Sequence, residues 1–161
     1  MGRAGGDAGS NNGVGGGGPM ILGVGVDLVA VEEVERAFHR QGDAFLERLL
    51  TPRERAACGD APAAGGFERI AARFAAKEAA MKALGTGWGG GVGFADIEVV
   101  GGRNARPGIE WHGGARAAAQ ALGATQVHLS LTHSAGLAVA VVVLEGAGPA
   151  SAATAPPPGR T

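Results

Sequence analysis

The chain has 161 residues, with 14 basic and 15 acidic side chains and a formal net charge of −1 at pH 7. Hydrophobic residues make up 45% of it, enough for a core and too many for a wholly disordered chain. The balanced charge argues against a general nucleic-acid binder, which needs a basic surface to hold phosphates. No apolar run reaches the roughly 18 residues of a membrane span, the N-terminus lacks a signal-peptide pattern, and the single cysteine, Cys58, excludes an internal disulfide. These features predict one cytoplasmic domain.

The two ends differ in composition from the middle of the chain. Residues 1–19 are rich in glycine, and residues 147–161 are rich in proline and alanine. Such compositions are typical of flexible segments. We therefore expect a folded domain over 20–146 between two disordered tails, 1–19 and 147–161.

The first third of the domain alternates between strand and helix signals. Met20–Asp27 is a short apolar run with β-branched residues, which predicts a buried strand. From Ala30 to Phe38 the apolar residues recur at helical spacing, and Gly42 ends that helix. Asp43 is the expected cap of a second helix, which carries apolar residues up to Leu50.

A capping signal and a long helix follow. Thr51-Pro52-Arg53-Glu54 predicts a helix start, with Thr51 as N-cap, proline at the first helical position and Glu54 completing a capping box. The strongest helix signal covers Phe67–Leu84, with Gly85 as its C-cap. The glycines of 87–93 predict a loop.

The last part of the domain is mostly strand. We expect strands over Phe94–Val100 and Pro107–His112 around a turn, then an alanine-rich helix over Gly113–Leu122. Alternation over 127–132 predicts a half-buried strand. A further strand over Gly136–Glu145 completes a predicted hairpin.

Glu78 is the first candidate for chemistry. It lies four residues after Phe74 and three before Met81, so helical geometry places it on the apolar stripe of the long helix. An isolated buried carboxylate is very costly and needs a proton, a partner or a cation. Glu78 is therefore either half of an ion pair, with Lys82 or an arginine, or a metal ligand.

Asp27 is the second candidate. It closes an apolar strand that contains Gly23 and Gly25, and strand ends present side chains to ligands. The alternative role for Asp27 is to cap the following helix. The two glycines do not form a dinucleotide fingerprint, because Val29 stands where the third glycine would fall.

Carboxylates from two separate elements, without a histidine or cysteine cluster, favour a hard cation such as Mg²⁺, which binds carboxylates and substrate phosphates. Lys77, Lys82 and Arg73 share the helix of Glu78 and are candidate phosphate partners. Arg73 and Lys77 form one i,i+4 pair, and Glu78 and Lys82 form another, in adjacent rows. The alternative is a solvated charged face.

His133 lies where a strand enters a tight turn and is flanked by Thr132 and Ser134. This polar cluster would hold a phosphate, although a histidine in such a turn is more often only exposed. Gly85 and Thr86, after the long helix, give an open backbone that a ligand could approach closely. The ordinary role of Gly85 is the helix C-cap.

Four segments, in this order, resemble the holo-[acyl-carrier-protein] synthases, the small bacterial 4′-phosphopantetheinyl transferases. They are the strand Gly23-Val24-Gly25-Val26-Asp27, the helix and turn from Ala72 to Gly87, the segment Phe94-Ala95-Asp96-Ile97-Glu98, and His128-Leu129-Ser130-Leu131-Thr132-His133. The resemblance covers nearly all of 20–145, and the helix motif is its most specific part.

The resemblance implies an α+β fold, with an antiparallel sheet packed on a long central helix, in a homotrimer. The implied reaction transfers 4′-phosphopantetheine from coenzyme A to a serine of acyl carrier protein and releases adenosine 3′,5′-bisphosphate. By position, Asp27 and Glu78 would bind Mg²⁺, and Lys82 would contact the same phosphates. Gly85 and Thr86 would line the nucleotide pocket. From its place on the helix of Glu78, Arg73 is also expected to contact coenzyme A. His133 of a neighbouring chain would complete the site.

The sequence departs from the family pattern at two positions. Glu33 stands where many members carry an arginine that meets the acidic carrier protein, and Ser134 stands where some carry a carboxylate. These departures keep open a second interpretation, a module that binds coenzyme A or a nucleotide without turnover. A third is a structural protein in which Glu78 and Lys82 form an internal ion pair.

Overall fold

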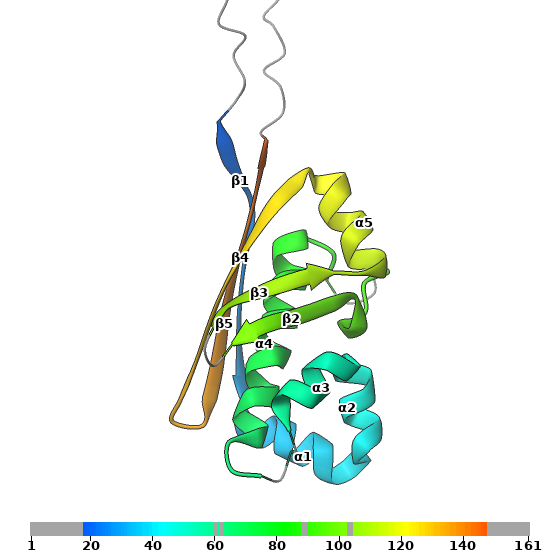
Figure 1. Cartoon of the computed structure of the whole chain (residues 1–161), viewed down its shortest axis with the longest axis vertical. Helices are drawn as coiled ribbons and strands as arrows, with labels where there is room; N and C mark the ends of the chain where they lie inside the picture. Colours follow the sequence, from blue (N-terminus) through cyan, green and yellow to red (C-terminus); the bar gives the residue numbers. More distant parts are fainter. Residues whose placement is uncertain (1–17, 60, 62, 88–89, 103–104, 148–161) are drawn as a thin grey trace, which may run out of the picture.

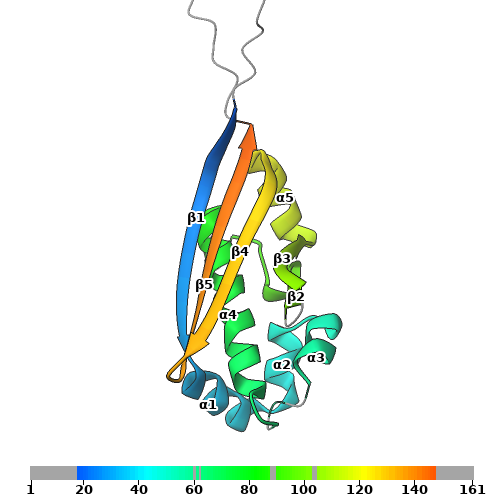
Figure 2. The same cartoon turned by 60° about the vertical axis from the view of Figure 1, so that its left-hand side comes forward.

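The fold is built around a three-stranded antiparallel sheet and one long helix (Figures 1 and 2). The computed structural model describes residues 18–59, 61, 63–87, 90–102 and 105–147. The sheet has the order β1-β5-β4, formed by β1 (Pro19–Ala30), β5 (Leu137–Ala147) and β4 (Ala124–Ser134). The predicted hairpin of the last two strands is confirmed, and β1 runs three residues past Asp27. The α+β class is therefore confirmed.

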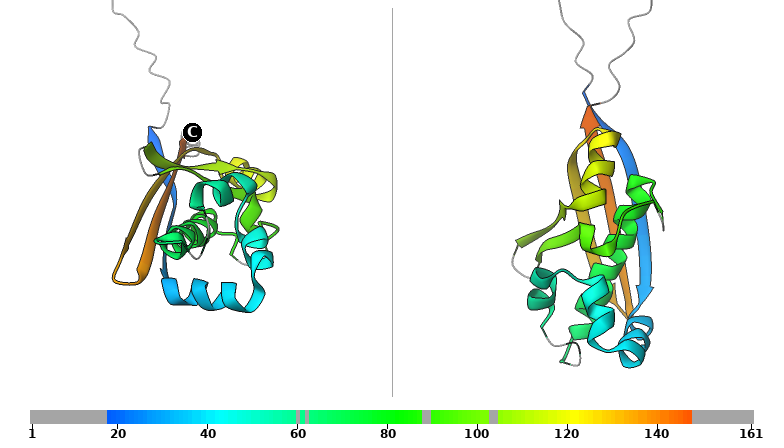
Figure 3. Two further views of the ribbon diagram at one scale, coloured as in Figure 1. Left: turned by 60° about the horizontal axis from the view of Figure 1, so that its bottom comes forward. Right: turned by 90° about the vertical axis from the view of Figure 1, so that its right-hand side faces the viewer.

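Helix α4 (Gly66–Leu84) is the central helix that the sequence predicts, and it packs on one face of this sheet. Thirteen of its residues are buried, including Arg73 and Lys77, so the helix is enclosed on most sides rather than amphipathic. Its other neighbours cover the sides that the sheet leaves open (Figure 3).

The remaining elements surround α4. Helices α1 (Val31–Gln41), α2 (Asp43–Leu49) and α3 (Pro52–Cys58) follow β1 in sequence. A single 3₁₀ turn, η1 (Phe94–Asp96), leads into a two-stranded sheet, and α5 (Gly113–Leu122) then leads to β4. The predicted strand from Phe94 therefore begins with a helical turn. The two strands of the smaller sheet are β2 (Ile97–Gly102) and β3 (Ala105–Trp111).

The capping box at the start of α3 is confirmed. The Thr51 hydroxyl accepts a hydrogen bond from the Glu54 backbone N–H at 3.2 Å. The Glu54 carboxylate accepts one in return from the Thr51 backbone N–H at 2.8 Å. Both donors belong to the first turn, where an α-helix leaves its own N–H groups unpaired.

The backbones of α4 and β1 approach each other closely at two glycines. A Cβ atom added at Gly23 would lie 2.1 Å from the Ala83 carbonyl oxygen, and one added at Gly25 would lie 1.8 Å from that of Ala79. Both distances are far below van der Waals contact. Because alternate strand residues share a face, Asp27 also points toward α4.

The two ends of the domain lie side by side, because Pro19 pairs with Ala147 across β1 and β5. These strands extend one residue past each end of the predicted 20–146 domain. The predicted tails otherwise lie outside the described residues. None of the helices in the described part of the chain is long and apolar enough to cross a membrane.

The face of β1 that points away from α4 is apolar and open. Ile21, Val24, Val26 and Leu28 are between 51% and 58% exposed. Their neighbours on β5, Val139, Val141 and Val143, are half-buried and continue the surface across the sheet. We call these seven residues the outer sheet face. A contiguous apolar surface of this kind is typical of a protein interface.

Replacing Gly25 tests the close approach of helix and strand. The Cβ atom of Gly25→Ala would overlap the backbone of α4, which has no flexible side chain to move aside. We expect a loss of unfolding free energy of about 3 kcal/mol, at the upper end for overpacking, measured by urea denaturation. The control is Gly108→Ala in β3, where the nearest atom is 3.6 Å away. A Gly25→Ala protein as stable as the control would contradict the close approach.

Candidate functional site

Asp27 and Lys82 form an ion pair between β1 and the last turn of α4. The Lys82 ammonium donates to Asp27 Oδ1 at 2.7 Å and to the Val26 carbonyl oxygen at 3.1 Å. The Asp27 side chain is 14% exposed and the Lys82 side chain 53%. The carboxylate is therefore the buried partner of the pair, and the ammonium is the exposed one. The pair is open to a ligand from the solvent side.

Glu78 lies one helical turn before Lys82 and is half-buried. The hydrogen bond from Lys82 to Asp27 raises the pKa of the Lys82 ammonium, and the charges of Asp27 and Glu78 add to this effect. Lys82 therefore stays a cation at neutral pH beside two acidic side chains. The structure thus brings together Asp27, Glu78 and Lys82, which the sequence placed on two separate elements.

Two alternative roles from the sequence can now be judged. Asp27 does not cap the following helix, because Ala30 is the N-cap of α1 and no side chain caps it. The alternative cap role is therefore wrong. The other role is the internal ion pair of Glu78 with Lys82: Lys82 bonds to Asp27, and the charge of Glu78 also acts on Lys82, so this ion pair stays a prediction.

Gly85 and Thr86 follow Lys82 directly and end the helix. Gly85 adopts a left-handed conformation with φ 71°, and its N–H donates to the Lys82 carbonyl at 3.1 Å. The Thr86 N–H donates to the Met81 carbonyl at 3.2 Å. The C-cap role of Gly85 is confirmed, and both residues lie at the same end of α4 as the Asp27–Lys82 pair.

Arg73 points to a different side of the helix. It is 9% exposed, and its Nη1 donates to the Arg69 carbonyl at 3.3 Å. Its Nε is buried and has no hydrogen-bond partner within the described residues. The alternative of a solvated charged face is wrong for Arg73. A buried guanidinium donor without a partner is suited to an anionic ligand.

His133 and Arg73 line one cavity of about 1090 Å³, together with Arg69, Leu131 and residues of α3 and the β2–β3 end. His133 lies on β4 opposite Ala138. Thr132 and Ser134 project to the other face of the strand, because strand side chains alternate. The expected cluster of His133 with its two flanking hydroxyls is therefore wrong. The charged residues that share the cavity with His133 are Arg69, Arg73 and Glu68.

Lys77 is not available to a ligand. Its side chain is fully buried and forms a 2.7 Å ion pair with Glu54, which is also fully buried. The ammonium also donates to the Phe94 carbonyl at 2.7 Å. Burial lowers the pKa of Lys77, and the charge and hydrogen bond of Glu54 oppose that effect. The expectation of Lys77 as a phosphate partner is wrong.

The predicted site residues fall into two groups on opposite sides of α4. Arg73 and Glu78 are five residues apart, which is about 140° around the helix axis, so their rows are not adjacent as expected. Asp27 lies on β1 and His133 on β4, the two outer strands of the sheet, with β5 between them. Asp27, Glu78, Lys82, Gly85 and Thr86 form the first half-site. Arg73 and His133, with Arg69, form the second.

The donors of the first half-site fit a hard cation. Asp27 and Glu78 offer carboxylate oxygens, which Mg²⁺ prefers, and Asp27 is largely shielded from solvent. Because Lys82 occupies Oδ1 of Asp27, Oδ2 is the oxygen left for a cation.

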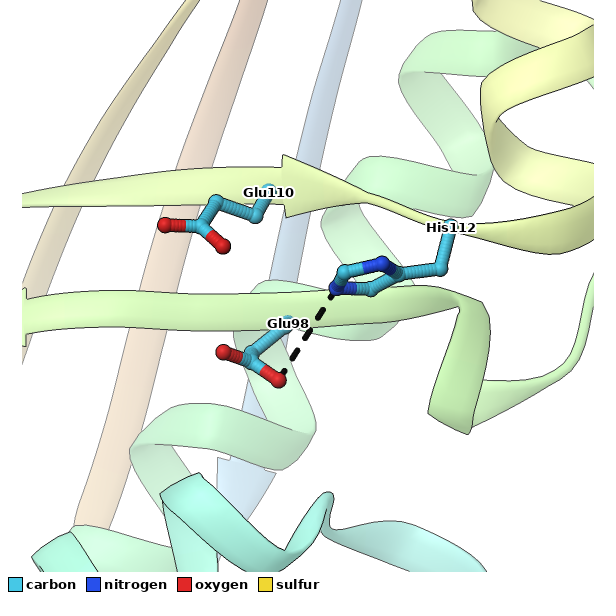
Figure 4. Close-up of side chains that lie close together, drawn as sticks. All are labelled: Glu98, Glu110 and His112. Carbon is cyan, nitrogen blue, oxygen red and sulfur yellow. Dashed lines mark ion pairs between the residues drawn. The ribbon is translucent and has the colours of Figure 1, made fainter.

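A second acidic group, away from this half-site, was not anticipated from the sequence. Glu98 and Glu110 pair across β2 and β3, and a carboxylate oxygen of each lies within 4.8 Å of a His112 ring nitrogen (Figure 4). Arg53 Nη1 contacts both carboxylates at 3.2 Å. The arrangement is an ion-pair cluster between α3 and the hairpin. The alternation Glu110-Trp111-His112 was a signal that two of these residues share a face.

The sequence and the fold agree with known proteins. The family model for the 4′-phosphopantetheinyl transferase superfamily matches residues 23–142. A holo-[acyl-carrier-protein] synthase of Solidesulfovibrio magneticus is 51% identical over 127 residues, covering 79% of this chain and 100% of that protein.

Solved structures give the same result. The synthase of Bacillus anthracis, in complex with CoA (3′,5′-ADP), is 38% identical, with a TM-score of 0.65 over 80% of this chain and 99% of that one. The Helicobacter pylori synthase, in complex with coenzyme A, is 33% identical, with a TM-score of 0.65 over 75% and 98%. The chain therefore belongs to the 4′-phosphopantetheinyl transferase superfamily, an enzyme family, and within it to the holo-[acyl-carrier-protein] synthases.

Proposed function

We propose that this enzyme transfers 4′-phosphopantetheine from coenzyme A to a serine of apo-acyl carrier protein, with Mg²⁺, and releases adenosine 3′,5′-bisphosphate. The observation that carries the proposal is the first half-site. It places a cation, Lys82, between Asp27 and the solvent, with Glu78 one helical turn away. This combination suits phosphoryl transfer, in which positioning and charge stabilisation supply most of the catalysis.

In this proposal, Asp27 and Glu78 hold Mg²⁺ beside the diphosphate of coenzyme A. The metal supplies charge neutralisation on the phosphate oxygens of the leaving group. Lys82, at the exposed rim of the half-site, donates to the same phosphates. Its raised pKa keeps it protonated, so its charge is available throughout the reaction. Gly85 and Thr86 line the pocket for the nucleotide.

The bonding changes follow from the substrate chemistry. The carrier serine oxygen forms a bond to the phosphorus that bears pantetheine, and the bond from this phosphorus to the diphosphate bridge oxygen breaks. The electron pair leaves with adenosine 3′,5′-bisphosphate. Some relatives have a carboxylate at the position of Ser134, and a serine there cannot act as the base. A water molecule therefore accepts the proton of the carrier serine. Lys82 stabilises the charge on the departing group.

The second half-site suits the anionic far end of coenzyme A. Arg73 has a buried Nε without a partner in the described part of the chain, and it lines the cavity that His133 also lines. Arg69 adds a second guanidinium to that cavity, against the single carboxylate of Glu68. These groups would bind a phosphate of the nucleotide by charge-assisted hydrogen bonds.

Because the two half-sites lie on opposite sides of α4, we propose that one ligand joins half-sites of different chains in a homotrimer. The outer sheet face, with four β1 residues more than half exposed, is the surface that another copy would cover. Burying it would stabilise the assembly by the hydrophobic effect. Each active site would then hold Asp27 and Glu78 of one copy with His133 of its neighbour.

The proposed partner is an acyl carrier protein, by default that of fatty acid biosynthesis, and the proposed compartment is the cytoplasm. The carrier would approach near α1, which begins one residue after β1 and carries Glu32 and Glu33 on exposed positions. Glu32 is already paired with Arg36 at 2.8 Å. Glu33 faces solvent and repels an acidic carrier.

The transfer reaction is tested by the intact mass of an apo-acyl carrier protein incubated with enzyme, coenzyme A and Mg²⁺. We expect the carrier to gain one phosphopantetheine group, and EDTA to abolish the gain. Glu78→Gln should lower the rate at least about 1000-fold while the protein stays folded by circular dichroism, because it removes a ligand of the metal. The matched control, Glu110→Gln, should retain activity. Coenzyme A binding without transfer to any carrier would favour the binding-module interpretation.

A mixing experiment tests the shared site. Asp27→Asn and His133→Ala chains should each have little activity, and co-expressing them should restore activity. In a random trimer, about one quarter of the interfaces join an intact Asp27 to an intact His133. Activity near that fraction of the wild-type rate is expected. If the mixture is no more active than the separate variants, each site belongs to one chain.

Charge reversal at Glu33 tests the carrier surface. Glu33→Arg should lower the KM for an acidic carrier several-fold and leave the KM for coenzyme A unchanged, because rim charges act mainly on association. The effect should shrink as salt rises. The control is Glu110→Gln, which removes a negative charge in β3, away from α1 and from the outer sheet face. An unchanged KM for the carrier would place its docking surface elsewhere.

A further inference from the structure

Helix α4 carries a four-residue repeat of alanines that does little to fix the helix along its axis, so that role falls to the larger side chains, such as Phe74 and Met81, and to the polar groups. The alanines come in pairs one turn apart, at 71–72, 75–76 and 79–80, and Ala83 continues the series. All seven are buried. A shift of the helix by four residues would therefore replace alanine with alanine, and alanine has no larger side chain to interlock with a neighbour.

The contact with β1 has the same property. At Gly23 and Gly25 the helix meets bare backbone, at the carbonyl groups of Ala83 and Ala79. Glycine allows the close approach, but it offers no side chain that would resist movement along the helix axis. The residues between the alanine pairs must supply that resistance.

Lys77 is a polar residue between these pairs whose side chain is fully buried. Its ammonium has no exposure and bonds to Glu54 Oε2 and to the Phe94 carbonyl. Glu54 is itself fixed, because it accepts hydrogen bonds from the backbone N–H groups of Thr51 and Val99 at 2.8 and 2.9 Å. The pair thus links α4 to α3, η1 and β2.

We propose that the buried Lys77–Glu54 pair sets the register of α4 and thereby positions Glu78 and Lys82 against Asp27. Glu78 is the next residue after Lys77, and Lys82 is five residues on. A slip of one turn would move both by about 6 Å along the axis, beyond hydrogen-bond reach of Asp27. Lys77 and Glu54 act through these residues and are positioning residues for the proposed transfer.

A buried ion pair can fix the register of a helix because a shifted register would leave its charges without partners, at a large cost in free energy. A buried charge that loses its partner is strongly unfavourable, whereas a matched apolar or neutral pair is often tolerated. A neutral replacement of both members should therefore keep the fold but release the register. This inference rests on the proposed function only for its consequence in catalysis, since the register itself is measurable without substrate.

The test uses Glu54→Gln/Lys77→Met, which removes both charges and keeps an acceptor oxygen for one of the two backbone N–H groups. The chain has two lysines, Lys77 and Lys82, so the double variant with ¹⁵N-labelled lysine gives one ammonium signal, that of Lys82. In the wild-type protein this signal reports the bonds of Lys82 to Asp27 and Val26. In the variant the chemical shift of the Lys82 ammonium should move to the value of a solvated lysine.

The binding readout is the affinity for Mg²⁺ in the presence of coenzyme A, measured by titration calorimetry. We expect it to weaken roughly 10- to 100-fold, as for loss of residues that orient metal ligands. Ile109→Ala in the hairpin is the control, since it destabilises the core without touching α4 polar contacts. It should leave the Lys82 signal and the Mg²⁺ affinity unchanged.

A folded double variant with the wild-type Lys82 signal and Mg²⁺ affinity would overturn the proposal. If the double variant does not fold, Glu54→Gln alone decides by the same two measurements, since Lys77 keeps its bond to Phe94. If wild-type enzyme shows no transfer but the Lys82 signal moves as expected, the proposed function fails and the register inference stands.

Discussion

The close contact between α4 and β1 is the constraint on which the site depends. Gly23, Gly25 and Asp27 are alternate residues of one strand, so all three face the helix. The glycines let the helix backbone approach the strand more closely than any side chain would permit. This approach brings the last two turns of α4, with Glu78 and Lys82, next to Asp27. The same pattern that resembled an incomplete dinucleotide fingerprint is thus the packing surface for a helix.

Burial and charge divide the polar residues of α4 into two kinds. Lys77 is enclosed and paired with Glu54, and its bonds are used entirely within the fold. Lys82 is half-exposed, and its pair with Asp27 faces solvent. One lysine therefore supports the structure, while the other is available to an anionic substrate. Arg73 combines the two properties, because it is buried but keeps a donor, Nε, that has no partner among the residues the structure describes, beside a cavity.

The sequence predicted the helices and strands better than it predicted the contacts between them. The helix over 67–84, its Gly85 cap, the capping box at Thr51 and the final hairpin follow from local patterns that the structure confirms. Local patterns do not reveal which side of a helix a distant element covers. For that reason the burial of Lys77 against Glu54, the pairing of Lys82 with Asp27 and the ion-pair cluster at Glu98 were not predicted.

Local sequence patterns also could not reveal that the two half-sites are separate. Arg73, Glu78 and Lys82 are close in sequence, but the helix turns them to opposite sides, and only the packed sheet shows that His133 joins Arg73 rather than Asp27. One chain alone therefore presents two incomplete binding surfaces for one long anionic substrate. In the proposed homotrimer, half-sites of different copies would join, and the outer sheet face would be covered.

A crystal structure of the enzyme with coenzyme A and Mg²⁺ tests this account most directly. The account predicts the diphosphate beside Asp27, Glu78 and Lys82 of one protomer, and a nucleotide phosphate bound by Arg73 and His133 of the neighbouring protomer. Coenzyme A bound wholly within one protomer, or away from Asp27 and Lys82, would contradict it.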